Sequence, residues 1–373
     1  MKTNVQATNR LHFIDHLRVL SVGLVMYGHF VLVGGGAKTI PNVIREDAHD
    51  LPILDHTNWG AQKFEILLIE SFSSQSAILG VAMFFVITGY LMPIMMERYS
   101  RKQFMINRFF RIYPLAIVTA LLIAPFAYFA QGFQFTAWQI FATASLLYPF
   151  LGVPVFNSVL WTLVVEMLFY ITVFLIGRFT ILKLLGVQVA ISFLIYCSIE
   201  YPEVWITQFL GWNARFVLMI CIGCAIYLAE KQRRPLVGFL LILWSLLLSY
   251  VGFKEYADHF DDTSTYQSFG THTLVVLGFL SYKGYFSMFV SSKSPLISTL
   301  SELVYPLYLV HMSFGLTTMY LLKDYLDSNY MLFITAVAVS VLASAALHIV
   351  IERPGIQWGR YFMIRPLPAG AVS

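Results

Sequence analysis

The chain has 373 residues, of which 58% are hydrophobic and only 12% are charged, and its mean hydropathy is +0.72. Soluble domains carry about 25% charged residues, so this composition excludes an ordinary soluble enzyme and a disordered or collagenous chain. The net charge of +4 is too small to indicate a nucleic-acid-binding protein. Most of the chain must therefore face lipid or a packed interior.

Ten apolar runs are long enough to cross the roughly 30 Å core of a bilayer as helices of about 20 residues. They lie near residues 14–33, 77–96, 111–130, 158–177, 179–199, 208–229, 236–253, 270–290, 299–322 and 330–351. The segment 134–151 is short and bounded by Gly132, Pro149 and Gly152, so we expect it to be interfacial or re-entrant. The sequence thus predicts an all-α fold: a single membrane domain, residues 1–373, forming a bundle of about ten transmembrane helices.

The lysines and arginines are concentrated in alternate connectors between these spans. With the N-terminus assigned to the cytoplasm, the cytoplasmic connectors contain Lys2, Arg10, Arg98, Arg101, Lys102, Arg108, Arg178, Lys183, Lys231, Arg233, Arg234, Lys283, Lys293, Arg353, Arg360 and Arg365. The opposite connectors contain Lys38, Arg45, Lys63, Lys254 and Lys323. This asymmetry follows the positive-inside rule, so we expect both termini to be cytoplasmic.

The connector 34–76 is predicted to be extracytoplasmic. Part of it, residues 62–72, has apolar residues at helical spacing, namely Phe64, Leu67, Leu68 and Phe72. Such spacing favours a helix that lies on the membrane surface or covers a cavity.

The cysteines do not indicate a disulfide framework or a metal site. Cys221 and Cys224 have CxxC spacing, but no second pair of ligands lies near them in the sequence. We expect both thiols to pack inside a helix, and we expect no bound metal.

Ionisable residues within spans are costly in lipid and therefore suggest functional sites. Arg18 and His29 of the first span would share one helix face, about 16 Å apart along the axis. Arg18 is expected near the cytoplasmic boundary, where the alternative is that it reaches lipid headgroups or pairs with Asp15. His29 could accept a proton from a hydroxyl, with a packed core histidine as an equal alternative.

The further ionisable residues singled out within predicted spans are Glu166, Arg215, Glu302, His311 and His348. Glu166 and Arg215 lie at similar distances from the outer ends of their spans, so they could meet as a structural ion pair or around a site. His311 lies near the middle of its span, where a hydrogen-bonded core histidine is slightly favoured over a catalytic one.

The basic segment 97–114 precedes the third span. It could be a plain positive-inside anchor. However, Arg108 and Arg111 are i,i+3 neighbours on one helical face, and Tyr113 and Pro114 are expected to fix the start of the helix. Because guanidinium groups match phosphate geometry, this face could bind a cytoplasmic donor that carries phosphates.

Six stretches stand in a characteristic order: FIDHLRVLSVGLVMYGHF at 13–30, MFFVITGYLM at 83–92, INRFFRIYP at 106–114, LWTLVVEMLFY at 160–170, YPLYLVHMSF at 305–314 and IERP at 351–354. Together they resemble the acyltransferase-3 family of integral membrane acyltransferases. The family's Arg-x10-His spacing is present at Arg18 and His29. His16 stands where the family usually has Gly, a mild departure that leaves both residues in place.

The resemblance implies a ten-helix core that takes acyl groups, usually acetyl from acetyl-CoA, and places them on carbohydrate hydroxyls. Arg18 would then hold the CoA phosphates together with Arg108, Arg111 and Tyr113. His29 would act as general base.

Glu166 would orient and stabilise the imidazole of His29. A buried carboxylate needs a partner of its own, for which Arg215 and Trp161 are the candidates. Asp15 and His311 complete the set of supporting residues that we expect around the site.

The expected acceptor is a lipid-linked or surface polysaccharide, such as lipopolysaccharide O-antigen or exopolysaccharide, and the expected location is a bacterial inner membrane. Many relatives carry an additional esterase-like domain, which we do not expect here. The alternative functions are a proton-coupled transporter, with a relay through the ionisable residues within spans, and a glycan flippase. Neither would consume a thioester.

Overall fold

The computed structural model describes residues 12–33, 60–72, 74–131, 134–153, 155, 157–260, 269–289, 294–326 and 328–364. Within these ranges the chain forms helices and contains no strand, which confirms the predicted all-α class. The α-helices are α1 (His12–Gly28), α2 (Gln62–Phe72), α3 (Ser76–Arg98), α4 (Arg101–Gln131), α5 (Ala137–Ala144), α6 (Trp161–Ile176), α7 (Ile181–Glu200), α8 (Trp205–Gln232), α9 (Pro235–Phe260), α10 (Phe269–Phe289), α11 (Pro295–Val310), α12 (Thr317–Leu322), α13 (Asn329–Leu347) and α14 (Arg353–Ile364).

Seven stretches of the described residues are long and apolar enough to cross a membrane. They are Ser76–Arg98, Arg101–Pro125, Ser158–Ile176, Ile181–Glu200, Trp205–Gln232, Pro235–Lys254 and Asn329–Met363. Each corresponds to one of the ten predicted spans, and together they indicate an integral membrane protein. The count of ten stays a prediction.

Two of the remaining predicted spans contain π-helical turns: 14–33 ends in one, and 299–322 is interrupted by one. The turn η1 (His29–Val33) follows α1, and η3 (His311–Leu316) joins α11 to α12. A third π turn, η4 (His348–Glu352), joins α13 to α14. Single π turns within helices occur frequently at functional sites because they displace a side chain from the regular helical position.

The start of the third predicted span was wrong. The helix α4 begins at Arg101, so residues 101–114 of the basic segment form its first turns instead of a connector. Pro114 therefore lies inside the helix and does not mark its start. The reason is that the residues before Pro114 continue the helical ladder, and a proline within a helix can bend it without ending it.

The segment 134–151 contains only the eight-residue helix α5, followed by turns. Thr136 caps this helix in a reciprocal pair with Gln139, which fixes its first turn. Eight residues are too few to cross a bilayer core. The prediction that this segment is not a full span is therefore confirmed.

The helix predicted within 62–72 is present as α2. Its buried residues are Gln62, Glu65 and Leu68, whereas most of its other apolar side chains, namely Phe64, Ile66, Leu67 and Phe72, are exposed. Glu65 accepts hydrogen bonds from the backbone N–H of Ser76, at 3.1 Å, and from the Ser76 hydroxyl. The polar side of α2 thus holds it against the start of α3, and its exposed apolar side is compatible with the predicted position at the membrane surface.

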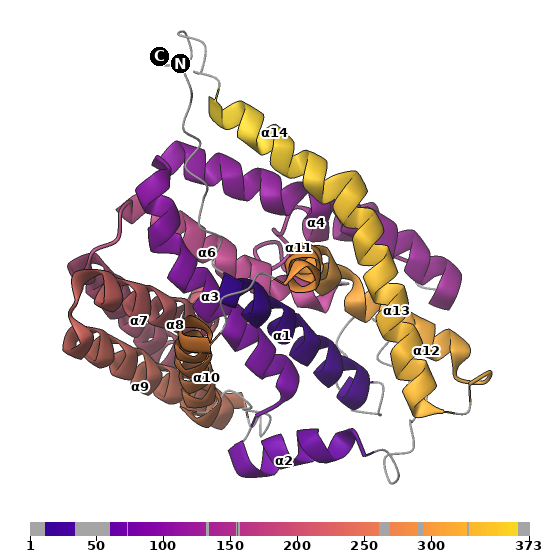
Figure 1. Ribbon diagram of the computed structural model, residues 1–373, viewed down its shortest axis with the longest axis horizontal. Coiled ribbons are helices and arrows are strands. Elements are labelled where there is room, and N and C mark those ends of the chain that lie inside the picture. Colours follow the sequence, from indigo (N-terminus) through magenta and orange to yellow (C-terminus); the bar gives the residue numbers. More distant parts are fainter. Residues whose placement is uncertain are drawn as a thin grey trace.

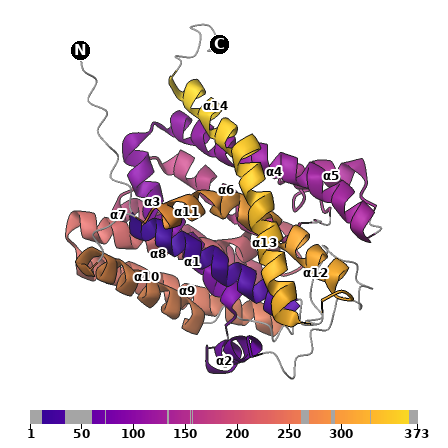
Figure 2. The same cartoon turned by 45° about the vertical axis from the view of Figure 1, so that its right-hand side comes forward.

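The helices form two groups around α1 and α3. α3 packs against α8, which is flanked by α7 and α9, while α10 contacts α3 and α9 (Figure 1). On the other side, α11 packs against α13, and α14 lies along α4 (Figure 2). α1 contacts both α3 and α11, so it joins the two groups through one large cluster of buried apolar side chains.

The contact between α3 and α8 depends on glycines. A Cβ atom at Gly89 would fall on the backbone carbonyl of Ile220, and one at Gly223 would fall on the carbonyl of Val86. Small residues allow such close approach of helix backbones in membrane proteins. At this contact the Cys224 thiol donates to the Gly89 carbonyl at 3.2 Å, so both cysteines pack inside α8 as predicted.

Substitution Gly89→Ala should destabilise the protein by about 1–3 kcal/mol, because the added methyl group overpacks this contact. Gly186→Ala on α7 is the matched control, since a Cβ atom there meets no other atom within 4 Å. Thermal unfolding in detergent should show a lower Tm for Gly89→Ala only. Equal Tm values would contradict the close approach of α3 and α8.

Candidate functional site

Two adjoining cavities open between α1, α3, α4 and α11. The larger, which we call the mouth cavity, has a volume of about 710 Å³ and is lined also by η4 and α14. The smaller, which we call the inner cavity, has a volume of about 110 Å³ and is lined also by α6. Both are lined by Arg18, Arg108, Arg111 and Ser301, so these residues stand where one cavity leads to the other.

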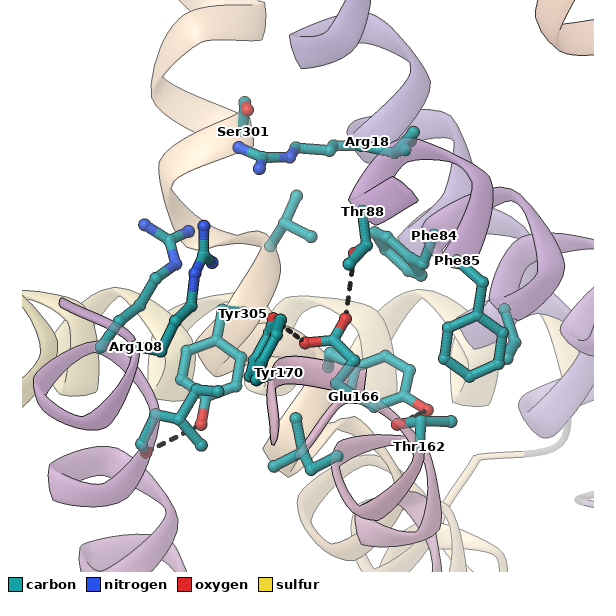
Figure 3. Close-up of a pocket in the computed structure, with 17 residues that line it drawn as sticks. Arg18, Phe84, Phe85, Thr88, Arg108, Thr162, Glu166, Tyr170, Ser301 and Tyr305 are labelled. Carbon is teal, nitrogen blue, oxygen red and sulfur yellow. Dashed lines mark hydrogen bonds between the residues drawn. The ribbon is translucent and has the colours of Figure 1, made fainter. Parts of the chain in front are cut away.

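The three arginines predicted to bind the donor meet at this junction. Arg18 extends from α1 toward Ser301 of α11, and Arg108 extends from α4 into the same space (Figure 3). The guanidinium of Arg108 lies 5.2 Å from the ring centre of Tyr170, and its Nε atom is buried with no hydrogen-bond partner. Within the described residues, none of these three arginines forms an ion pair. Their concentrated positive charge is suited to an anionic ligand.

The mouth cavity contains further charged side chains. Its additional arginines, which the sequence indicated only as positive-inside charges, are Arg98, Arg353 and Arg360. Some of its acidic groups have other partners: Glu352 lies 2.7 Å from His348, and Asp15 accepts a hydrogen bond from Ser301 at 2.8 Å. Asp15 thus links α1 to α11 at the edge of the mouth cavity.

Glu166 lies in the inner cavity. Its carboxylate accepts hydrogen bonds from Thr88 at 3.1 Å and from Tyr170 at 2.5 Å (Figure 3). These hydroxyls are the partners that a half-buried carboxylate requires. Tyr170 stands four residues after Glu166, so its helical spacing could have been recognised in the sequence, whereas Thr88 comes from α3 and could not.

The predicted partners of Glu166 were wrong. Arg215 is buried on α8, with its guanidinium 5.2 Å from the ring centre of Trp212 and its side chain against Gly252 of α9. Trp161 packs against Phe216, with ring centres 4.5 Å apart. Neither residue lines the inner cavity. Trp161 is five residues from Glu166, so it points to another side of α6.

Tyr113 also lies away from both cavities. Its ring stacks on Phe109 with centres 4.8 Å apart. Arg108 and Arg111 are on one face of α4, as predicted, but Tyr113 is turned away from that face by the helical repeat. Its predicted role beside the donor is therefore not supported by its position.

His29 contacts His311 and not Glu166. The Nδ1 atom of His29 lies 2.8 Å from Nε2 of His311, and the two rings are nearly parallel, with centres 5.0 Å apart and an interplanar angle of 16°. His311 is completely buried, and its Nδ1 atom lies 2.8 Å from the carbonyl oxygen of Tyr308. Each histidine is the first residue of a π turn. The prediction that Glu166 orients His29 is thus corrected: His311 occupies that position.

Tyr308 connects the histidine pair to the inner cavity. Its side chain lines the cavity, accepts a hydrogen bond from the Thr162 hydroxyl at 3.0 Å, and has its ring centre 5.8 Å from that of His311. Arg18 and His29 both face α11 and its continuation, through Ser301 and His311 respectively. Their predicted position on one side of the first helix is confirmed. The inner cavity therefore extends from the arginines to Tyr308, whose ring separates the cavity from His311.

No group of three or more His, Cys, Asp or Glu side chains that could hold a metal occurs in the described part of the chain. Comparison with curated proteins and with solved structures finds no match. Comparison with protein families finds one described as an acyltransferase domain, which matches residues 11–350. This match covers nearly the whole chain, including the residues that line the inner cavity and the two histidines, so the protein belongs to the acyltransferase-3 family and is a membrane acyltransferase.

Proposed function

We propose that the protein transfers an acetyl or other short acyl group from cytoplasmic acyl-CoA to a hydroxyl of a cell-surface glycan. The observation that carries this proposal is the cavity lined by Arg18, Arg108 and Arg111, which have no ion pairs within the described residues and lead toward His29. CoA supplies the matching charges, because it carries a diphosphate and a 3′-phosphate next to a long thioester arm.

The donor would bind with its phosphates in the mouth cavity and its pantetheine arm in the inner cavity. The arginines at the junction hold the phosphates, and their forked guanidinium groups give both charge and orientation. The arm passes Glu166, which accepts hydrogen bonds and can receive an amide N–H of pantetheine. Glu166 thus helps to bind the donor. The sequence had suggested a different role, in which Glu166 orients His29.

The reaction needs a base for the acceptor hydroxyl. His29 takes the hydroxyl proton on the ring nitrogen that does not face His311, and the hydroxyl oxygen attacks the thioester carbonyl carbon. The new C–O bond forms, the C–S bond breaks, and the CoA sulfur receives the proton back from His29. The products are the acyl ester and free CoA thiol, with no net change in the enzyme.

The acceptor and the location are proposed from the resemblance to the family. We propose a lipid-linked or surface polysaccharide, such as lipopolysaccharide O-antigen or exopolysaccharide, and a bacterial inner membrane. Half-buried His29 at the end of α1 is compatible with an acceptor that approaches from the side opposite to the mouth cavity.

The test is acyl transfer by the purified protein. Protein in lipid nanodiscs is supplied with acetyl-CoA and with lipopolysaccharide extracted from cells that lack the gene, and free thiol and glycan mass are measured. We expect thiol release and an acetyl mass increment on the glycan. A transporter or flippase would release no thiol above the rate without protein, and mass spectra of surface glycans would be the same with and without the gene.

Substitution Glu166→Gln should raise the KM for acetyl-CoA by about tenfold and change kcat less, because one charge-assisted hydrogen bond to the donor is lost. Glu97→Gln is the control, since Glu97 pairs with Lys231 on the surface, outside the inner cavity. Steady-state kinetics distinguish the outcomes. A fall in kcat with unchanged KM would instead indicate that Glu166 acts in the chemical step and not in donor binding.

A further inference from the structure

We propose that His311 is a positioning residue that holds His29 in the tautomer with the proton on Nδ1, so that Nε2 of His29 is the base. This inference deepens the proposed function and rests on it for its consequence in catalysis. The tautomer itself follows from the contacts of the two rings.

Two backbone carbonyl groups determine which ring nitrogen of His311 carries the proton. Nδ1 of His311 lies 2.8 Å from the carbonyl oxygen of Tyr308 and 3.3 Å from that of Leu307. A carbonyl oxygen can only accept, so Nδ1 of His311 must carry a proton and donate it. In the neutral imidazole the other nitrogen, Nε2, then has a lone pair and can only accept.

The second step is the contact between the rings. Nε2 of His311 lies 2.8 Å from Nδ1 of His29, and one of these two atoms must donate. Because Nε2 of His311 is the acceptor, Nδ1 of His29 carries the proton. The remaining nitrogen of His29, Nε2, is therefore unprotonated and free to take a proton, since the hydrogen bond of one ring nitrogen sets the tautomer of the other.

The surroundings of His311 preserve these tautomers of the two histidines. The side chain is completely buried, and the nearby rings of Phe30 and Tyr308 have centres 6.2 Å and 5.8 Å from the imidazole. No carboxylate forms an ion pair with His29 or His311 among the described residues. When His29 takes the substrate proton, its Nδ1–H stays bonded to His311, so the cation is held in place without a second proton transfer.

Side-chain replacement tests the acceptor role. Glutamine can present an amide oxygen near the place of the His311 Nε2 atom, whereas leucine fills the space without an acceptor. We expect His311→Leu to lower kcat by roughly 10²- to 10⁴-fold, as loss of a tautomer-fixing partner does in other enzymes. His311→Gln should retain at least about ten times the kcat of His311→Leu, and both should keep the KM for acetyl-CoA.

His272→Leu on α10 is the matched control, because His272 is equally buried but lines neither cavity and packs on Phe253. We expect His272→Leu to keep the kcat of the wild type per folded protein. Equal kcat values for the leucine and glutamine variants of His311, at equal Tm, would overturn the positioning role.

The tautomer can also be measured directly in the wild type. Protein labelled with 15N-histidine in nanodiscs gives different 15N chemical shifts for protonated and unprotonated ring nitrogens, and His29→Gln and His311→Gln assign the signals. We expect protonated Nδ1 and unprotonated Nε2 for both residues. An Nε2–H tautomer of His29 overturns the inference. Because this measurement needs no substrate, its outcome is separate from that of the proposed function, which fails instead if the wild type releases no thiol.

Discussion

Replacement of His29 by alanine should lower kcat for acyl transfer by at least about a hundredfold, because general base catalysis contributes roughly 10²- to 10⁴-fold. The half-buried ring lies at the end of α1. Its Nδ1 atom is hydrogen-bonded to His311, and its Nε2 atom has no hydrogen-bond partner among the described residues. The neighbouring imidazole of His311 does not readily replace that of His29, since His311 is completely buried behind it. Binding of acetyl-CoA should persist, because the arginines of the mouth cavity remain.

His16→Ala is the control for this experiment. His16 belongs to the same helix but contacts Tyr282, at 2.9 Å, and lines neither cavity. Thiol release and glycan acetylation are compared at equal amounts of folded protein. Near-normal acetylation by His29→Ala would end the assignment of His29 as the base, and an equal loss in His16→Ala would attribute the effect to the stability of α1.

The arrangement of α1 could be predicted because it depends on one helix only. The spacing of Arg18 and His29 fixes their common side, whatever the rest of the chain does. The same holds for Arg108 and Arg111 on α4. Local periodicity likewise identified α2, and the short length of 134–151 between glycine and proline residues excluded that segment as a span.

Partners across helices could not be predicted in this way. Similar depth in the membrane suggested that Glu166 and Arg215 meet, but depth does not determine which way a side chain faces around its helix. In the structure Glu166 lies between Thr88 and Tyr170, while Arg215 lies against α9.

The pairing of His29 with His311 was missed for a further reason. Both residues begin π turns, which shift the side chains that follow from their α-helical positions. The sequence does contain a partial signal, since His29 lies one residue and His311 three residues before the end of a family-like stretch. Only the packing of α1 against α11 brings them to 2.8 Å.

Replacement of Arg18 by glutamine should raise the KM for acetyl-CoA by about tenfold to a hundredfold, because a charged hydrogen bond contributes about 1.5–3 kcal/mol. Arg18 lies at the junction of the two cavities with Arg108 and Arg111, and none of the three has an ion pair in the described part of the chain. Arg18→Lys should recover only part of the affinity, since lysine keeps the charge but lacks the planar fork.

Acetyl-pantetheine, which lacks the nucleotide and its phosphates, separates loss of phosphate binding from damage to the site. Its KM should be high in the wild type and unchanged by Arg18→Gln, because no phosphate remains for the arginine to hold. Arg234→Gln, at an exposed position between α8 and α9, should leave both KM values unchanged. If Arg18→Gln impaired both donors equally, Arg18 would act on the acyl end or on the packing of α1 against α11, and the mouth cavity would lose its assignment as the phosphate site.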